Sequence, residues 1–147
     1  MSQDIGLNGK LPELSSAIGL RQLEMLPDRL AKRQQVLNWY LASLQPLGCV
    51  FQAGVARAVP PFLSVALASP DRRERAGTAL EGARIGWRSY YNPPIHCQPT
   101  FADVRKAGEL SVTEDLAGRI FSLPLDDRLS QGDVLRVAGV VGHVVGD

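Results

Sequence analysis

The 147-residue sequence has few of the features that identify several common classes of protein. It contains only two cysteines, Cys49 and Cys97, which are too few for a disulfide framework and do not give a zinc-binding spacing. No apolar run reaches the roughly 18 residues of a membrane span, and charge and glycine interrupt the N-terminus where a signal peptide would be apolar. We therefore expect a cytoplasmic protein without a membrane segment.

The sequence also has little excess of either charge. Sixteen lysines and arginines face 15 aspartates and glutamates, which gives a net charge of +1. Such a balance provides no field that would attract nucleic acid or an anionic membrane, so we expect neither as a partner. The composition, 45% hydrophobic and 21% charged, is typical of a folded protein, and the length suits one domain.

The N-terminal third predicts a helical arm made of two helices. Between residues 11 and 26, the leucines and Ile18 are spaced so that their side chains lie around most of a predicted helix. Pro12 is favourable in the first turn of this helix, and Pro27 is expected to end it. Asp28 is a good N-cap for a second helix through Leu44. Because the first helix is apolar on nearly every side, we expect a second domain or a second copy of the chain to cover it.

The remaining residues alternate between helices and short extended runs. Helices are predicted over 71–84, after the Ser111–Glu114 capping box, and after the N-cap Ser130, with extended runs at 49–51, 62–68, 87–91 and 122–125. The prediction is an α/β (α+β) sandwich, in which helices cover one side of a short, mostly antiparallel sheet. It is a single domain over 1–147, divided into an arm (1–45) and a small α/β domain (46–147).

The sequence offers little catalytic chemistry of its own. His96 and Cys97 are adjacent, but neighbours on an extended chain point to opposite faces, so we interpret them as a loop histidine and a buried thiol. The two histidines and two cysteines fit no metal-ligand spacing, and we predict no metal site. His143 lies near the C-terminus of the last helix, where it would interact with the helix dipole.

Two stretches have both a structural and a functional interpretation. In GLNGKL, Asn8 and Lys10 either cap the following helix or present polar groups to an anion such as phosphate at the helix N-terminus. In RSYYNPPIHCQPTF, residues 88–101, Tyr90, Tyr91 and His96 either line a ligand cleft or pack against the sheet. The residues alone leave both pairs of alternatives open.

Three blocks of the sequence resemble the DegT/DnrJ/EryC1/StrS family of pyridoxal-phosphate (PLP) sugar aminotransferases. Residues 6–44 resemble the family segment that begins with Gly-any-Asn, a basic residue and Ala-Ala-Ile-Gly. Residues 85–101 resemble its loop of paired aromatics, prolines and histidine, and residues 110–137 resemble its end, with Leu-Pro-Leu before a last helix. The resemblance implies the small C-terminal domain of a type I aminotransferase fold.

The resemblance also implies roles for particular residues. Asn8 and Lys10 match family positions that contact the phosphate of PLP, where the asparagine reaches the cofactor of the neighbouring subunit. Tyr90, Tyr91 and His96 match the loop beside the nucleotide-sugar substrate. The implied partners are a second copy, or a large domain or subunit that bears the Schiff-base lysine. Polysaccharide or glycoside biosynthesis is the implied pathway.

The sequence departs from the family at the catalytic lysine. That lysine lies in the family's large domain, upstream of Gly-any-Asn, whereas the lysines here are Lys10, Lys32 and Lys106 and none has the expected context. Transamination needs the lysine as covalent anchor and proton carrier. We therefore expect a C-terminal portion of a sugar aminotransferase that is inactive alone. The alternatives are a non-enzymatic dimerisation or regulatory module, and an unrelated small enzyme that uses the loop from Tyr90 to His96.

Overall fold

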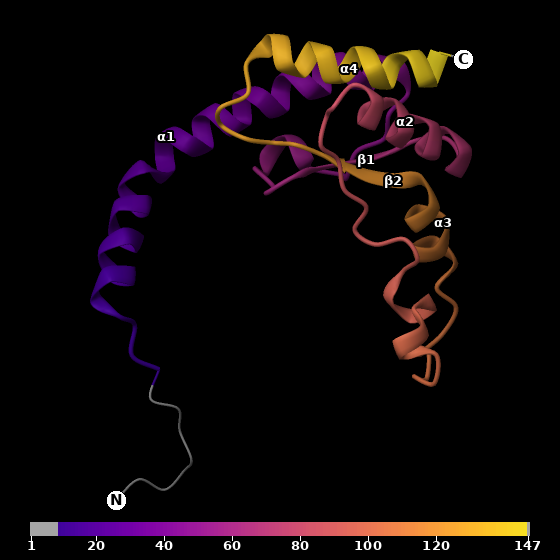
Figure 1. Ribbon diagram of the computed structural model, residues 1–147, viewed down its shortest axis with the longest axis horizontal. Coiled ribbons are helices and arrows are strands. Elements are labelled where there is room, and N and C mark those ends of the chain that lie inside the picture. Colours follow the sequence, from indigo (N-terminus) through magenta and orange to yellow (C-terminus); the bar gives the residue numbers. More distant parts are fainter. Residues whose placement is uncertain (1–8, 147) are drawn as a thin grey trace, which may run out of the picture.

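A computed structural model describes residues 9–146, and its longest element is the N-terminal helix α1, Glu13–Leu44. Pro27 lies inside this helix, so the predicted break there is wrong. Proline lacks the N–H that would bond to the carbonyl four residues earlier, and its ring crowds that carbonyl, so a helix can continue through it only with a bend. Figure 1 shows α1 changing direction about midway along its length.

The sheet consists of two short antiparallel strands, β1 (Leu63–Ala66) and β2 (Ile120–Leu123). Val50 forms an isolated bridge with β1, and Arg88 forms one with β2. The extended runs predicted at 49–51 and 87–91 are therefore not full strands, and each adds a single bridging residue to the sheet. The register pairs Leu63 with Leu123 and places Ser64 opposite Ser122. Because side chains alternate along a strand, one face of the sheet is wholly apolar and the other carries the Ser64–Ser122 pair beside Ala66 and Ile120.

Three helices cover the apolar face of the sheet. They are the C-terminal half of α1, α2 (Pro70–Gly82) and α4 (Gln131–Gly146), and α4 contacts both α1 and α2 (Figure 1). Tyr40, Phe121, Leu80 and Val141 are buried in the shared core, one from each of four elements. The predicted sandwich, with helices on one side of a short antiparallel sheet, is therefore confirmed.

The start of α4 confirms the predicted cap at Ser130. The Ser130 hydroxyl accepts a bond from the Asp133 amide at 3.2 Å, and the Asp133 carboxylate accepts one from the Ser130 amide at 2.9 Å. This reciprocal pair is a capping box. The capping box predicted at Ser111 is wrong: Ser111 is already the first residue of helix α3 (Ser111–Arg119), and Glu114 pairs with His96 instead.

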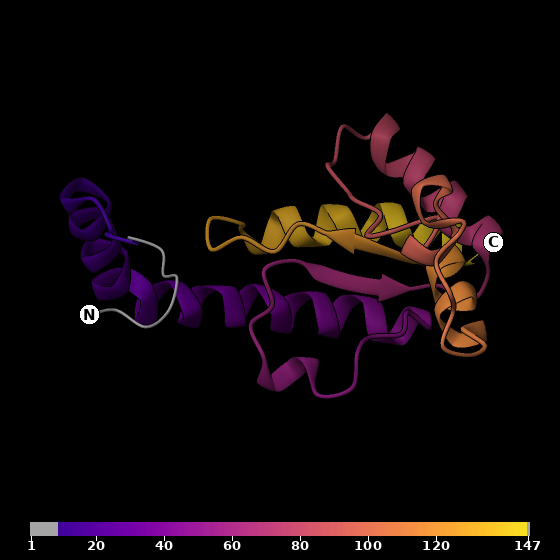
Figure 2. The same ribbon diagram turned by 90° about the horizontal axis from the view of Figure 1, so that it is seen from below.

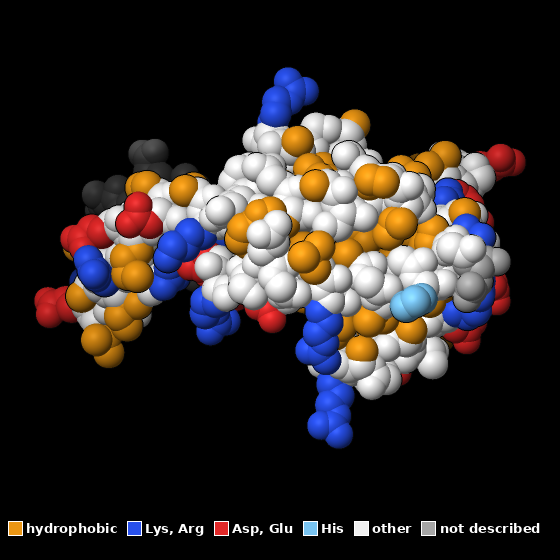
Figure 3. Space-filling view, turned by 90° about the horizontal axis from the view of Figure 1, so that it is seen from above, with side chains coloured by type: hydrophobic (Ala, Val, Ile, Leu, Met, Phe, Trp, Pro, Cys, Tyr) orange, Lys and Arg blue, Asp and Glu red, His pale blue; other side chains and the backbone are white. Residues whose placement is uncertain are grey.

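The chain has the outline of an arch with two legs. The N-terminal half of α1 forms one leg, and residues 89–119, which include α3, form the other (Figures 1 and 2). On the first leg, the apolar side chains expected to be covered are exposed, with 74% of Leu14 and 54% of Ile18 accessible. Hydrophobic and charged side chains intermingle there in Figure 3. Among residues 9–146, no helix has both the length and the apolar character needed to cross a membrane.

Candidate functional site

The loop after Arg88 and helix α3 together form the candidate site. Tyr90, Tyr91 and His96 line a single hollow of about 370 Å³, so the structure brings the three predicted substrate residues together. The other walls are apolar and come from the loop, from α3 and from the start of β2; they include Ile95, Leu116, Ala117 and Ile120. Apolar walls with a few convergent polar groups are typical of small-molecule sites.

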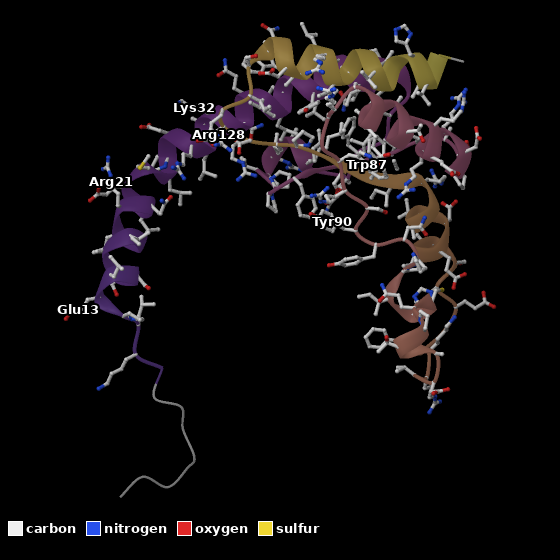
Figure 4. The ribbon with its side chains drawn as sticks, in the orientation of Figure 1. Glu13, Arg21, Lys32, Trp87, Tyr90 and Arg128 are labelled. Atoms are coloured by element: carbon white, nitrogen blue, oxygen red, sulfur yellow. The ribbon has the colours of Figure 1, made fainter. Side chains whose placement is uncertain are left out.

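Tyr90 also borders a second hollow, of about 330 Å³, on the polar side of the sheet. Its ring lies 4.8 Å from the ring of Phe62 and 5.8 Å from that of Tyr91, measured between centroids. Phe62, Trp87 and Ser122 line this second hollow with Tyr90. Figure 4 places Trp87 close to the sheet and Tyr90 below it, toward the open space between the legs of the arch. The exposed rings of Phe62, Tyr90 and Tyr91 therefore form one continuous aromatic surface that a partner or ligand could reach.

Polar contacts to Glu114 connect the loop to α3. The His96 Nε2 atom lies 2.9 Å from the Glu114 Oε1 atom, and Lys106 Nζ lies 3.8 Å from the same oxygen. His96 and Cys97 are part of a short 3₁₀ helix, Ile95–Cys97, so the expectation that they lie on extended backbone is wrong. Cys97 is exposed, and the expected buried thiol is instead Cys49. Burial raises the pKa of Cys49 to about 11.

Of the two residues predicted to contact the cofactor, Lys10 is among the described residues, and it lies next to the other leg. Lys10 is exposed on the segment that leads into α1, and Asn8 lies outside the described residues. Lys10 precedes α1, whose N-terminal half is one leg, whereas the hollow beside His96 is lined by residues of the other leg, and Figure 1 shows that the two legs are well separated. Within this chain they do not form one site.

A charged hollow of about 560 Å³ lies at the bend of α1. Arg21, Lys32 and Arg128 line it, as Figure 4 shows, together with three aspartates. Arg128 pairs with Asp126 at 2.8 Å, and Arg29 pairs with Asp127 at 3.8 Å. Hydrogen bonds from the side chain and backbone of Arg128 lower the pKa of Asp126 to about 2. Because four basic side chains face three aspartates in this hollow, its charges nearly cancel, and we do not assign it to an anion.

Two members of the site were missed by the sequence analysis. Glu114 was interpreted as a cap residue because its spacing from Ser111 fits a capping box. Phe62 was assigned to a strand, and its contact with Tyr90 depends on how the chain folds back. For both residues the partner is distant in sequence, so local patterns carried no signal of it.

Comparison with known proteins identifies relatives that are considerably longer than this chain. Protein Rv3402c of Mycobacterium tuberculosis is 41% identical over 143 residues, which are 95% of this chain and 35% of the relative. The UDP-2-acetamido-2-deoxy-3-oxo-D-glucuronate aminotransferase of Pseudomonas aeruginosa is 29% identical over 138 residues, 88% of this chain and 35% of that enzyme. The chain thus spans about a third of the length of these curated relatives.

A solved structure shares the fold. A Bacillus cereus protein assigned as a PLP-dependent aminotransferase superposes with a TM-score of 0.84 at 27% identity, over 95% of this chain and 39% of that one. The small α/β domain described above is therefore a domain found in aminotransferases. The model of the DegT/DnrJ/EryC1/StrS aminotransferase family matches residues 1–142. The chain belongs to the DegT/DnrJ/EryC1/StrS aminotransferase family.

Proposed function

We propose that this chain is the C-terminal portion of a PLP-dependent aminotransferase that acts on a nucleotide-linked keto-sugar. The observation that carries the proposal is the family match over residues 1–142, combined with a fold that corresponds to about 39% of an aminotransferase chain. The Pseudomonas relative, whose name specifies a UDP-linked oxo-sugar, supports the substrate class. Polysaccharide or glycoside biosynthesis is the corresponding pathway.

The hollow beside His96 suits a part of such a substrate. The rings of Tyr90 and Tyr91 offer flat apolar surfaces, against which a sugar or a base can pack. Their hydroxyl groups and the His96 imidazole can hydrogen-bond to ligand oxygens. We assign these three residues to substrate binding, and the apolar wall of α3 to the exclusion of water.

The lysines of this chain do not fit the covalent anchor of PLP. When PLP is bound to such an enzyme, it withdraws electrons from the amino substrate, and a lysine holds it as a Schiff base. A lysine activated for this role is shielded from water, whereas Lys10, Lys32 and Lys106 are all exposed and Lys106 lies 3.8 Å from Glu114. We therefore propose that these 147 residues alone do not transaminate.

We propose that this chain contributes to cofactor binding through contacts with the phosphate group of PLP. Lys10 is an exposed cation just before α1, where backbone N–H groups of the first helical turn point outward. Asn8, outside the described residues, would act beside it. Both residues would reach a cofactor held mainly by another domain or subunit.

The proposed partner is a lysine-bearing large domain seated against the first leg of the arch. Exposed Leu14, Ile18 and Leu23 give that leg an apolar surface that single folded chains usually bury. A second copy of the chain is the other occupant we expect, because symmetric dimers are the commonest assemblies. That second occupant corresponds to the alternative function, a dimerisation or regulatory module.

Borohydride trapping tests the proposal. The chain is incubated with PLP, alone and after coexpression with the portion of the Pseudomonas aminotransferase that lies outside the matched region. We expect no stoichiometric pyridoxyl-lysine in the chain alone, and in the mixture one adduct on the added portion together with amino transfer. A site-specific adduct on Lys10, Lys32 or Lys106, accompanied by amino transfer, would overturn the inactivity proposal. Binding without any amino transfer would favour the regulatory module.

A further inference from the structure

Three side chains with different metal-binding groups meet at the end of the second leg. A ring nitrogen of His96, the thiol sulfur of Cys97 and a carboxylate oxygen of Glu114 all lie within 4.8 Å of one another. Within residues 9–146, no other group of three histidine, cysteine or acidic side chains meets in this way. The cluster was not visible in the sequence because Glu114 comes from α3, whereas the other two residues come from the preceding loop.

The backbone explains why the three groups converge. The 3₁₀ helix Ile95–Cys97 turns tightly, so His96 and Cys97 are not held on opposite faces as they would be on a strand. Glu114 lies in the first turn of α3, and its Oε1 atom is 2.9 Å from the His96 Nε2 atom. The 3₁₀ helix and α3 thus place their metal-binding side chains close together in space.

We propose that His96, Cys97 and Glu114 bind one divalent ion of the zinc class. Imidazole nitrogen, thiolate sulfur and carboxylate oxygen are the usual ligands of Zn²⁺, with bonds of about 2.0–2.3 Å in tetrahedral geometry. Such bonds place the ligand atoms roughly 3.3–3.8 Å from one another. The His96–Glu114 contact must therefore open slightly and the thiol must approach, which Cys97 and Glu114 can do by rotation because both side chains are exposed. The fourth position is left for water or a ligand.

Lys106 is the group that competes with the ion. Its ammonium lies 3.8 Å from Glu114 Oε1, so a metal ion would replace it as the partner of the carboxylate. Both side chains are about half exposed, and Lys106 can move into solvent. His96 also lines the hollow with Tyr90 and Tyr91, so the ion would be bound at the edge of that hollow and would fasten the loop to α3.

Cobalt titration tests the site, because Co²⁺ replaces Zn²⁺ and a thiolate bound to it gives a charge-transfer band in the near ultraviolet. We expect this band to saturate at one ion per chain and to be reversed by added Zn²⁺. Cys97→Ser abolishes the band, and His96→Gln and Glu114→Gln each weaken binding at least about tenfold. Lys106→Gln strengthens binding, since it removes the competing cation.

His143→Gln is the matched control, because it removes the other histidine of the chain, which is exposed on α4. This variant should bind Co²⁺ like the unmodified chain, and circular dichroism should show that every variant is folded. The proposal is overturned if no thiolate band forms, if Cys97→Ser retains it, or if His143→Gln weakens binding as much as His96→Gln does. Each of these results would mean that His96, Cys97 and Glu114 do not bind an ion together.

Discussion

The indole ring of Trp87 lies directly against the Cα of Gly77 in helix α2. A Cβ atom built on Gly77 would be 2.6 Å from Cζ2 of Trp87, closer than carbon atoms can approach. The ring is held on several sides: its Nε1 donates to Glu81 at 3.2 Å, the guanidinium of Arg73 lies 5.0 Å from the ring centroid, and Phe121 packs edge-on. Gly77 is therefore required by packing, although glycine weakens a helix.

Gly77→Ala should consequently destabilise the fold. Forcing a methyl group into a packed contact costs about 1–3 kcal/mol, which exceeds the gain of up to about 1 kcal/mol from the better helix propensity of alanine. A fall of a few degrees in Tm is expected in thermal unfolding. Gly82→Ala, at the end of the same helix and with open space around its Cβ, is the control and should leave Tm unchanged or raise it. Equal behaviour of the two variants would show that Trp87 moves aside easily.

The cap of α4 makes a second prediction. Ser130→Ala removes the hydroxyl that accepts the Asp133 amide, and loss of an N-cap costs typically about 1 kcal/mol. Ser111→Ala is the control because Ser111 lies within α3 instead of preceding it. Urea unfolding should show a lower midpoint for the first variant and a change within error for the second. A larger effect of Ser111→Ala would restore the sequence-based assignment of that residue as a cap.

The structure separates what short sequence patterns can predict from what they cannot. The cap at Ser130 and the buried valines of α4 follow from spacings within one helix, and both were predicted correctly. Pro27 predicts a helix end, but a long helix can continue through one proline with a bend. Glu114 fits both a capping box with Ser111 and a contact with His96, and only the tertiary structure decides between these two roles. The family roles came from resemblance, and Asn8 lies outside the described residues.

Acid should weaken the connection between β2 and α4 through Asp126. The pKa of this carboxyl is about 2 in the folded chain and its ordinary value is 3.8, so its contribution to stability is complete above about pH 4 and is lost as the pH falls toward 2. The Arg128 side chain is 87% exposed, so solvent screening keeps the contribution of the pair small. Asp126→Asn should therefore lower the unfolding free energy slightly at pH 6, and the difference from the unmodified chain should disappear as the pH falls through 2. A constant difference across this range would exclude the ionised pair as the cause.

The two thiols should differ sharply in reactivity. Cys49 is 5% exposed, and burial raises its pKa to about 11, so almost none of it is thiolate at pH 8. Cys97 is exposed. A disulfide reagent should label one thiol per folded chain quickly and the second only in denaturant, and Cys97→Ser should remove the fast phase. Fast labelling of both thiols would show that the core around Cys49 opens readily.

The exposed leg of the arch predicts the behaviour of the isolated chain. Leu14 and Ile18 lie four residues apart on α1, so they share a face of the helix, and 74% and 54% of their surfaces are accessible. Without a large domain to cover this face, we expect a second copy to do so. Leu14→Asp combined with Ile18→Asp should convert a dimer into a monomer in light scattering. Leu135→Asp, which alters an exposed leucine of α4, should not. A dimer that survives the double substitution would place the interface elsewhere and leave this leg available for the large domain alone.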